Sequence, residues 1–403
     1  MKRPQRLIHR LEEAVGDRAA DVLSLPLRLA GKRAYRYMLR ALKERQPAEV
    51  DVTIKLVAPD YVAPDPAERS MVERILQAFV HAKREQTSGD SRLLPSGGWK
   101  TVLEQAYEPL IRGGRNQDLE TFHYYLANFG AWHEPTGITE SYLLRGIGAS
   151  RQRQKHFENR VMADMIAWWQ LFEAHGRELD ALRFPRFGNQ SGVSVGSHFL
   201  STDSVPSDVD ARVIAGLVSD QCPLLAELGG GFGRLITFVS RWLTNFRYLG
   251  FDLPECLACA SYYLMQVFPD KRFLLYGEAD WTRLDWADYD FVLLPSYELS
   301  KLPASTVDLF LNENSLGVMT PEACRYFVGE ICRTARGFWH RNHEVRTNRF
   351  PDGIKSLVNR EYPIPADRFV QRARYCDVRR FIGADGATLD NDMYWHYYEA
   401  TDK

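Results

Sequence analysis

The chain has 403 residues, of which 45% are hydrophobic and 26% are charged, and its formal net charge is −1. This length exceeds that of one small domain, so we expect two structural units. The near-neutral charge gives no electrostatic reason to bind nucleic acid, and we predict no such partner. No apolar run approaches the ~20 residues of a membrane span, and no signal-peptide core opens the sequence, so we expect a cytoplasmic protein.

The N-terminal segment, residues 1 to about 48, is predicted to be helical and basic. Between residues 25 and 45, seven lysines and arginines accompany a single acid, Glu44. Leucines and tyrosines between these cations give the segment an apolar component. The pattern is typical of a solvated helix that docks on the body of the protein, and its alternative is peripheral contact with an anionic membrane.

Helical periodicity continues to about residue 185, after a proline-rich connection at residues 57–66. The predicted helices lie around residues 71–79, 103–111, 119–126 and 153–179. We therefore assign residues 1–188 to a helical N-terminal domain on the acceptor side of the protein. Its conspicuous ring side chains either pack in the core, which we favour, or line an acceptor site. They are Trp99, His123, Tyr124, Tyr125, Trp132 and His133.

Beyond about residue 195, short apolar runs alternate with helical patterns. The predicted strands are residues 224–226, 248–251, 273–276, 291–294, 308–311 and 337–339. This alternation predicts a doubly wound, Rossmann-like α/β sheet over residues 189–403, and the tail suits a closing antiparallel hairpin. The set contains one strand more than such a sheet needs, so either 273–276 or 291–294 is an insertion.

The six cysteines show no disulfide-framework spacing. Cys256 and Cys259 form a C-x-x-C pair, but the surrounding sequence predicts a helix, and no second pair lies at a zinc-ribbon distance. We therefore interpret both residues as small side chains in the core of the α/β unit.

A glycine-rich turn follows the first strand of this unit, and a helical pattern begins directly after it. The turn carries four regularly spaced residues, Glu227, Gly229, Gly231 and Gly233. Arg234 occupies the third glycine position of the dinucleotide fingerprint, and no Gly-Lys-Ser/Thr follows as in a phosphate loop. Nineteen residues beyond Gly233 the second strand ends at Asp252, whose carboxylate is placed to accept hydrogen bonds from ribose hydroxyls. The turn and the acid together indicate a nucleoside-containing ligand.

Residues 227–233, Glu-Leu-Gly-Gly-Gly-Phe-Gly, and residues 251–255, Phe-Asp-Leu-Pro-Glu, resemble the first two motifs of class I S-adenosylmethionine-dependent methyltransferases. More narrowly, they resemble those of the sugar O-methyltransferases. Residues 187–192 and 307–316 are also similar to that family, and the similarity spans roughly residues 187–346. The resemblance implies S-adenosylmethionine as the cofactor, a sugar, nucleotide-sugar or glycan acceptor, and a role in polysaccharide biosynthesis.

We expect the cofactor at the carboxyl ends of the strands. The glycine turn would hold its methionine part and its ribose, and Asp252 would also bind the ribose. Adenine contacts depend on which run is the third strand. They are Ser296 and Tyr297 if that strand is 291–294, and Glu278 and Asp280 if it is 273–276, and we select Ser296.

Catalysis needs a group that activates the acceptor, because a sugar hydroxyl is a weak nucleophile at neutral pH. Polar residues follow the fourth strand at positions 312–315, and the fifth strand ends in residues 339–344. We predict that His343 is the general base and that Glu313 and Asn314 orient the acceptor.

Two histidines, His340 and His343, lie three apart and therefore on opposite sides of an extended strand. His343 lies further toward the carboxyl end, where the cleft should open, and Glu313 and Glu344 are the alternative bases. The pair could also be structural or bind a metal ion, but apart from Glu344 no carboxylate stands at a recognisable ligand spacing, so we predict no metal site.

The sequence leaves two hypotheses of different kinds and does not indicate an oligomeric state. The first is an S-adenosylmethionine-dependent O-methyltransferase acting on a sugar or glycan hydroxyl. The second is a catalytically silent, methyltransferase-like scaffold in a glycan-assembly complex. Glu227, the three glycines and Asp252 are all present, which favours the enzyme.

Overall fold

The computed structural model describes residues 52–401 except 89, 91–92, 96–97, 173–177, 220, 284, 351–352 and 378–391. The predicted basic N-terminal helix lies outside the described residues. Among those that are described, no helix is long and apolar enough to cross a membrane.

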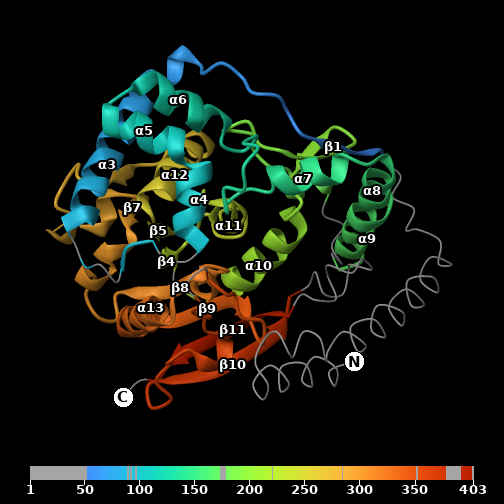
Figure 1. Ribbon diagram of the computed structural model, residues 1–403. Coiled ribbons are helices and arrows are strands. Elements are labelled where there is room, and N and C mark those ends of the chain that lie inside the picture. The colour runs from blue at the N-terminus through green and yellow to red at the C-terminus, as the bar shows by residue number, and fades with distance from the viewer. Residues whose placement is uncertain are drawn as a thin grey trace.

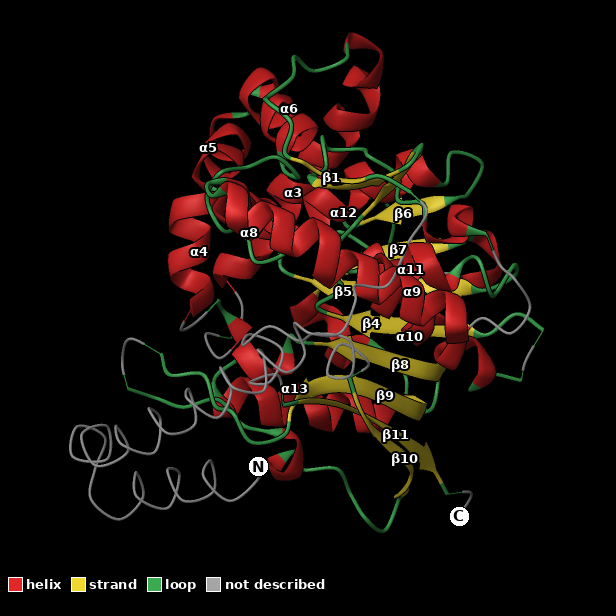
Figure 2. Ribbon diagram, turned by 90° about the vertical axis from the view of Figure 1, so that its right-hand side faces the viewer, coloured by secondary structure: helices red, strands yellow, loops and turns green. Residues whose placement is uncertain are grey.

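A sheet of eight strands organises the chain, in the order β10-β11-β9-β8-β4-β5-β7-β6 (Figure 2). Six strands are parallel: β4 (Leu224–Leu228), β5 (Arg247–Asp252), β6 (Phe273–Leu275), β7 (Phe291–Pro295), β8 (Val307–Glu313) and β9 (Ala335–His343). The hairpin of β10 (Phe369–Cys376) and β11 (Met393–Ala400) is antiparallel and joins the sheet beside β9. The predicted doubly wound α/β class with a closing hairpin is confirmed.

The additional strand is β6, at the edge of the sheet. β7 pairs with β5, and β6 pairs with β7 on its other side. The run at 291–294 is therefore the neighbour of the second strand, and 273–276 is the extra one. From β4 the chain winds outward through β5, β6 and β7 and then crosses to β8 on the opposite side of β4. This reversal makes the carboxyl ends of β4 and β8 the switch point where such sheets bind ligands.

Two apolar clusters cover the two faces of the sheet. Along β8 the side chains alternate, so that Leu309 and Leu311 join one cluster and Phe310 joins the other. The first face carries α10 (Ser204–Gly216), α11 (Arg234–Val239) and α12 (Pro254–Val267). The second face carries α13 (Pro321–Thr334) and the short helix η7 (Ser296–Lys301).

The first part of the chain packs on α12 (Figure 1). Its helices on this side are α3 (Arg69–Ser88), α4 (Gly98–Ala106), α5 (Glu108–Asn116) and α6 (Leu119–Asn128). Buried residues of α3 and α6, such as Phe79 and Phe122, belong to the same cluster as Tyr263 of α12. Further along come α7 (Ser141–Gly148), α8 (Arg151–His156), the π-helix η3 (Phe157–Met162) and α9 (Ala163–Phe172).

The predicted boundary between residues 188 and 189 falls within continuous structure. A small antiparallel sheet joins β1 (Ile54–Val57) to β2 (Gly192–Val195) and β3 (His198–Leu200). The first part is therefore not wholly helical as predicted, because β1 is a four-residue run whose pairing partner is distant in sequence. The two predicted units share this sheet as well as the core around α12.

Candidate functional site at the carboxyl edge of the sheet

The glycine turn after β4 has a backbone that side chains would not tolerate. Gly229, Gly231 and Gly233 have φ of 74°, 62° and 95°, in the left-handed region that favours glycine. At Gly230 a Cβ atom would lie 2.7 Å from the Oε2 atom of Glu227. α11 begins directly after Gly233, so the turn joins a strand end to a helix start as predicted.

Asp252 and Glu227 both lie against this turn. The Gly231 N–H donates to Oδ2 of Asp252 at 2.9 Å, and the Leu253 N–H donates to Oδ1 at 2.7 Å. The Tyr248 hydroxyl donates to Oε2 of Glu227 at 2.7 Å. The acids and glycines that the sequence singled out are thus brought together at adjacent strand ends.

Both carboxyl groups titrate near neutral pH. Burial raises the pKa of Glu227 to about 7, and the charge of Asp252 adds to the rise while the Tyr248 hydrogen bond opposes it. Burial likewise raises the pKa of Asp252 to about 7, against the hydrogen bonds from the backbone of Leu253 and Gly231. A ligand that donates hydrogen bonds or carries positive charge would stabilise the ionised forms of both groups.

A loop from the first part of the chain covers the glycine turn. A Cβ atom at Gly231 would lie 3.3 Å from Cγ2 of Ile138. A buried hydrogen bond holds this loop in place, because the Tyr107 hydroxyl donates to the Thr136 carbonyl at 3.0 Å. Sequence reasoning missed Ile138, since nothing in its neighbourhood indicates which strand end it covers.

The predicted adenine contact, Ser296, lies beside Asp252. Asp252 is in register with Pro295, and Ser296 follows as a buried residue that begins η7. The alternatives follow the outer strand β6, where Glu278 pairs with Arg74 and the Oδ1 atom of Asp280 accepts the Thr282 hydroxyl. This favours Ser296, whose contact with a ligand remains a prediction.

The polar residues after β8 form a buried network. The Asn312 amide donates to the Leu228 carbonyl at 2.9 Å and accepts from Asn342 at 2.9 Å. The Ser315 hydroxyl also donates to Leu228, at 3.0 Å, and a Cβ atom at Gly229 would lie only 2.2 Å from the Ser315 Cβ. These contacts press the loop after β8 against the glycine turn.

Glu313 lies between two arginines, and one of these is deeply buried. Its carboxylate pairs with Arg341, 2% exposed, and with Arg234 at 3.4 Å. Arg341 also contacts Asp377 at 2.8 Å and Asp210 at 3.3 Å. Glu313 therefore anchors cations within the fold, and its predicted role in orienting an acceptor remains a prediction.

Asn314, the second residue predicted to orient the acceptor, is exposed at the end of β8. It has a φ of 61°, which Asn tolerates better than most residues, and its N–H donates to the Arg341 carbonyl at 2.9 Å. Its backbone is thus held at the carboxyl edge by β9, and contact of its side chain with an acceptor remains a prediction.

The two histidines of β9 lie on opposite faces, as the spacing predicted. His343, at the carboxyl end, is 23% exposed, and its Nδ1 atom lies 2.6 Å from Oδ1 of Asp392. His340 is fully buried, stacks on His396 with ring centroids 5.0 Å apart, and has a pKa well below its ordinary value because of burial. Of the two histidines, His343 is therefore the one exposed to solvent, and its role as the general base remains a prediction.

Glu344, one of the two alternative bases, is engaged elsewhere. It accepts hydrogen bonds from Arg374 at 2.6 Å and Asn359 at 3.1 Å, and it pairs with His396 at 3.2 Å. Although burial raises it, these hydrogen bonds lower the pKa of Glu344 to about 2. A carboxylate with this pKa is a poor proton acceptor near neutral pH.

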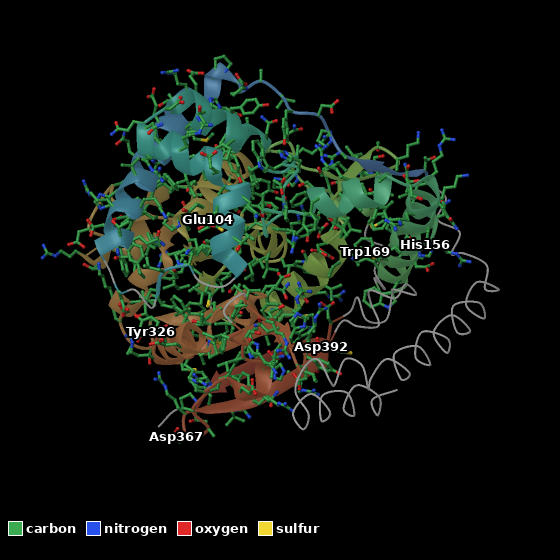
Figure 3. The ribbon with its side chains drawn as sticks, viewed as in Figure 1. Glu104, His156, Trp169, Tyr326, Asp367 and Asp392 are labelled. Carbon is green, nitrogen blue, oxygen red and sulfur yellow. The ribbon has the colours of Figure 1, made fainter. Side chains whose placement is uncertain are left out.

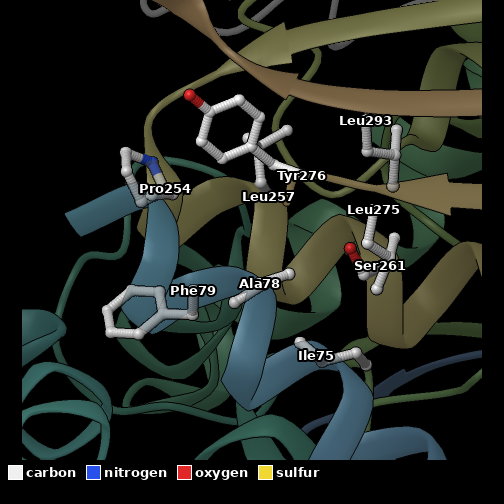
Figure 4. A pocket seen from close by; sticks show the side chains of 11 residues that line it. Ile75, Ala78, Phe79, Pro254, Leu257, Ser261, Leu275, Tyr276 and Leu293 are labelled. Atoms are coloured by element: carbon white, nitrogen blue, oxygen red, sulfur yellow. The ribbon is translucent and has the colours of Figure 1, made fainter. Parts of the chain in front are cut away.

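No metal cluster is found in the described part of the chain, and a cavity of about 440 Å³ opens between α3 and the end of β6, lined by residues such as His81, Tyr276 and Glu278. No three His, Cys, Asp or Glu residues there are grouped as metal ligands. The pocket in Figure 4 lies between α3, α12 and the β6 and β7 strands, with Pro254 and Leu257 at its α12 side. Its volume of about 20 Å³ admits little more than a water molecule, so it is no cofactor site.

Sequence reasoning missed three partners of the predicted residues: Tyr248, Arg341 and Asp392. Tyr248 is a polar-tipped residue in an otherwise apolar parallel strand, which is a usable signal for a buried hydrogen bond. Asp392 directly precedes the last strand of the predicted hairpin, so pairing β11 with β9 would have placed it beside His343. Arg341, which follows the apolar residues 338–339 of a predicted buried strand, could likewise have indicated a buried ion pair.

No family model matches the sequence, and no curated protein matches it. Several solved structures with partial similarity are methyltransferases by name. The mitomycin 7-O-methyltransferase MmcR is 11% identical, with 50% of this chain and 56% of that chain covered and a TM-score of 0.33. A SAM-dependent methyltransferase from Aquifex aeolicus is 12% identical, with 49% and 92% covered and a TM-score of 0.33.

The glycopeptide N-methyltransferase MtfA, complexed with sinefungin, is 14% identical, with 49% of this chain and 87% of that chain covered and a TM-score of 0.33. The chain thus spans little more than half the length of the mitomycin enzyme. Similarity at this level carries no inference about activity or substrate. The fold class of this chain rests on its own strand order.

Proposed function

We propose that the chain is an S-adenosylmethionine-dependent methyltransferase. The observation that carries this proposal is the carboxyl edge of β4 and β5, where three left-handed glycines meet two carboxyl groups. Gly231 donates its N–H to Asp252, and Glu227 lies directly beneath the turn. The site lies at the switch point of a doubly wound sheet, where nucleotide-like ligands bind.

The residues fit this cofactor. Each oxygen of Asp252 accepts one backbone N–H and, when ionised, has a further lone pair for a ribose hydroxyl. Three glycines of the turn have the left-handed φ that a tight strand-to-helix turn requires, and Ser315 and Ile138 pack against two of their Cβ positions. The cofactor supplies a methyl group on a positively charged sulfur, and the ionised forms of Glu227 and Asp252 favour a cation at this edge.

More specifically, we propose that the acceptor is a hydroxyl of a sugar or glycan. The resemblance of residues 227–233, 251–255 and 307–316 to the sugar O-methyltransferases supports this acceptor. His343 supports O-methylation, because it lies at the carboxyl end of β9 with one ring nitrogen held by Asp392 and can take a proton at the other. The alternative, a silent scaffold, does not require Glu227 and Asp252 to remain against the turn.

Isothermal titration with S-adenosylmethionine tests the first step, and mass spectrometry of an acceptor panel tests the second through the gain of one methyl group. Once an acceptor is found, His343→Gln should lower turnover by ~10²–10⁴-fold while cofactor affinity is preserved. His340→Gln is the matched comparison on the other face of β9. A wild-type rate for His343→Gln would remove His343 from the proposal and leave the cofactor site intact.

A further inference from the structure

Asp392 lies where it can control the chemistry of His343. It precedes β11, and Figure 3 places it at the opposite end of the β10–β11 hairpin from Asp367. Its Oδ1 atom is 2.6 Å from the Nδ1 atom of His343. Because a carboxylate accepts hydrogen bonds and does not donate them, this contact requires the proton of a neutral imidazole to be on Nδ1.

The second carboxylate oxygen is held by the backbone. The N–H groups of Val345 and Arg346 both donate to Oδ2 of Asp392 at 2.6 Å. Although burial raises it, the hydrogen bonds from His343, Arg346 and Val345 keep the pKa of Asp392 below its ordinary value. The carboxylate is therefore fixed in position and orientation by three donors, and Oδ1 faces His343.

His343 in turn lies at the carboxyl end of β9, the edge of the sheet at which the glycine turn also lies. It lies two residues beyond Arg341 on the same face of β9, and Arg341 joins Glu313, which contacts Arg234 at the start of α11. A Cβ atom at Gly317 would lie 4.0 Å from the Cδ2 atom of His343. Two residues earlier the same loop presses Ser315 against the glycine turn.

We propose that Asp392 is a positioning residue that fixes the tautomer of His343, so that Nδ1 carries the hydrogen and Nε2 is free to take the proton of the acceptor hydroxyl. This inference rests on the proposed methyltransferase function. In the step, the acceptor oxygen bonds to the methyl carbon, its O–H bond breaks, and the proton passes to Nε2. The electron pair of the broken carbon–sulfur bond stays on sulfur. Asp392 remains ionised beside the imidazolium.

The test is the substitution of Asp392 by the isosteric Asn, which should reverse the tautomer of His343. In Asp392→Asn the Val345 and Arg346 N–H groups still need an acceptor, so they should bind the amide oxygen. The amide nitrogen, which only donates, would then face Nδ1 of His343 and force the hydrogen onto Nε2. In Asp392→Ala the ring loses its partner but keeps access to both tautomers.

The expected order of turnover is therefore wild type, then Asp392→Ala, then Asp392→Asn, with the Asn variant reduced by ~10²–10⁴-fold. A merely structural role predicts the reverse order for the two variants, since Asn preserves the shape and Ala does not. Cofactor affinity measured by titration should stay unchanged in both. An Asn variant as active as the Ala variant or more so would overturn the proposal.

A spectroscopic measurement reads the same dyad without turnover. Ring ¹⁵N–¹H correlation spectra of histidine-labelled protein distinguish the two tautomers, and His343→Gln identifies the signal among the ten histidines. Wild type should show hydrogen on Nδ1 and Asp392→Asn should show it on Nε2. A wild-type His343 with hydrogen on Nε2 would overturn the proposal even if neither variant folds.

Glu344→Gln is the matched control, because it alters the other histidine–carboxylate pair at this end of β9, that of His396. It should leave the His343 tautomer and turnover as in wild type, and a loss equal to that of Asp392→Asn would overturn the proposal. The outcomes also separate the two levels of inference. Absence of cofactor binding or of any acceptor in wild type would reject the methyltransferase function itself, whereas normal turnover in Asp392→Asn rejects only the role of Asp392.

Discussion

The carboxyl edge of the sheet has two halves whose charges are arranged in opposite ways. At β4 and β5, Glu227 and Asp252 accept hydrogen bonds from a tyrosine hydroxyl and from backbone N–H groups, and within the described residues neither forms an ion pair. At β8 and β9, Glu313 is paired with Arg341 and Arg234. We propose that the first pair of acids serves a ligand, whereas the charges of the second half pair with one another within the fold.

If this contrast is correct, removing the buried arginine of the second half should lower the stability of the protein. Arg341→Met leaves Glu313, Asp377 and Asp210 without the buried guanidinium, and we expect the free energy of unfolding to fall by ~3–5 kcal/mol. Denaturant unfolding measures this loss. The control is Arg372→Met, which removes an ion pair with Glu399 that is about half exposed and should cost at most ~1 kcal/mol. Equal losses in the two variants would contradict the contrast.

A substitution in the glycine turn of the first half should instead lower the affinity for the cofactor. Gly231→Val would place a branched side chain at a φ of 62°, with the first added carbon already 3.3 Å from Ile138. We expect S-adenosylmethionine affinity to fall at least ~100-fold, or ~2.7 kcal/mol. Gly353→Val is the control for backbone strain, because Gly353 has a φ of 84° but open space around its Cβ position. Calorimetric titration of both variants checks the expectation, and a Gly231→Val protein that folds and binds normally would place the cofactor elsewhere.

A milder change at the same edge is Asp252→Asn, which keeps the shape and removes the charge. Loss of charge-assisted hydrogen bonds to ribose should weaken cofactor binding by ~10- to 100-fold, or 1.5–3 kcal/mol. The control is Asp290→Asn at the other end of β7, where the carboxylate accepts the Arg272 N–H at 2.9 Å. Equal affinities for the two variants would show that Asp252 serves the turn and not the ligand.

The sequence predicted the first half well because its determinants are local. The turn at 227–233 and the acid at 252 lie within one strand–helix–strand unit, so spacing alone placed them at adjacent strand ends. The sequence left open whether β6 or β7 is the extra strand, because both runs are short and apolar and only pairing with β5 distinguishes them.

The second half could be predicted only in part, because its contacts join distant segments. His343 was correctly expected at the strand end on the face opposite to His340, since strand periodicity fixes that. Its partner Asp392 and the cover by Ile138 depend on how β11 and the first part of the chain dock, which no local pattern encodes. The polar residues 312–315 were noticed in the sequence. Whether they contact a ligand or other residues of the protein could be decided only from the partners of Asn312 and Glu313 in the structure.

The last expected effect is the pH dependence of stability and of cofactor affinity, which tests whether the acids of the first half differ from the paired Glu313 of the second. Glu227 has its pKa raised by burial from 4.5 to about 7, with Asp252 opposing its ionisation and Tyr248 and Arg234 favouring it. A carboxyl group with a raised pKa in the folded state holds its proton more tightly there than in the unfolded chain. Its contribution therefore lowers the stability of the ligand-free protein as pH rises from about 4.5 to about 7, and the effect levels off above that pH.

Cofactor binding should show the opposite trend, because a cationic ligand favours the ionised site. Between pH 6 and pH 8 the ionised fraction of a group with a pKa near 7 rises about tenfold, so each of the two acids should increase S-adenosylmethionine affinity by up to ~10-fold. Titration calorimetry of wild type and Glu227→Gln across this pH range measures the change in affinity. The variant should retain only the pH dependence due to Asp252, whose pKa is also raised to about 7. The Glu330→Gln control alters a carboxylate paired with Arg333 on α13 and should leave the wild-type trend. If cofactor affinity in wild type does not change with pH, the ionisation of Glu227 and Asp252 is not linked to ligand binding. The only remaining difference between the two halves of the edge would then be that Glu313 is paired with arginines.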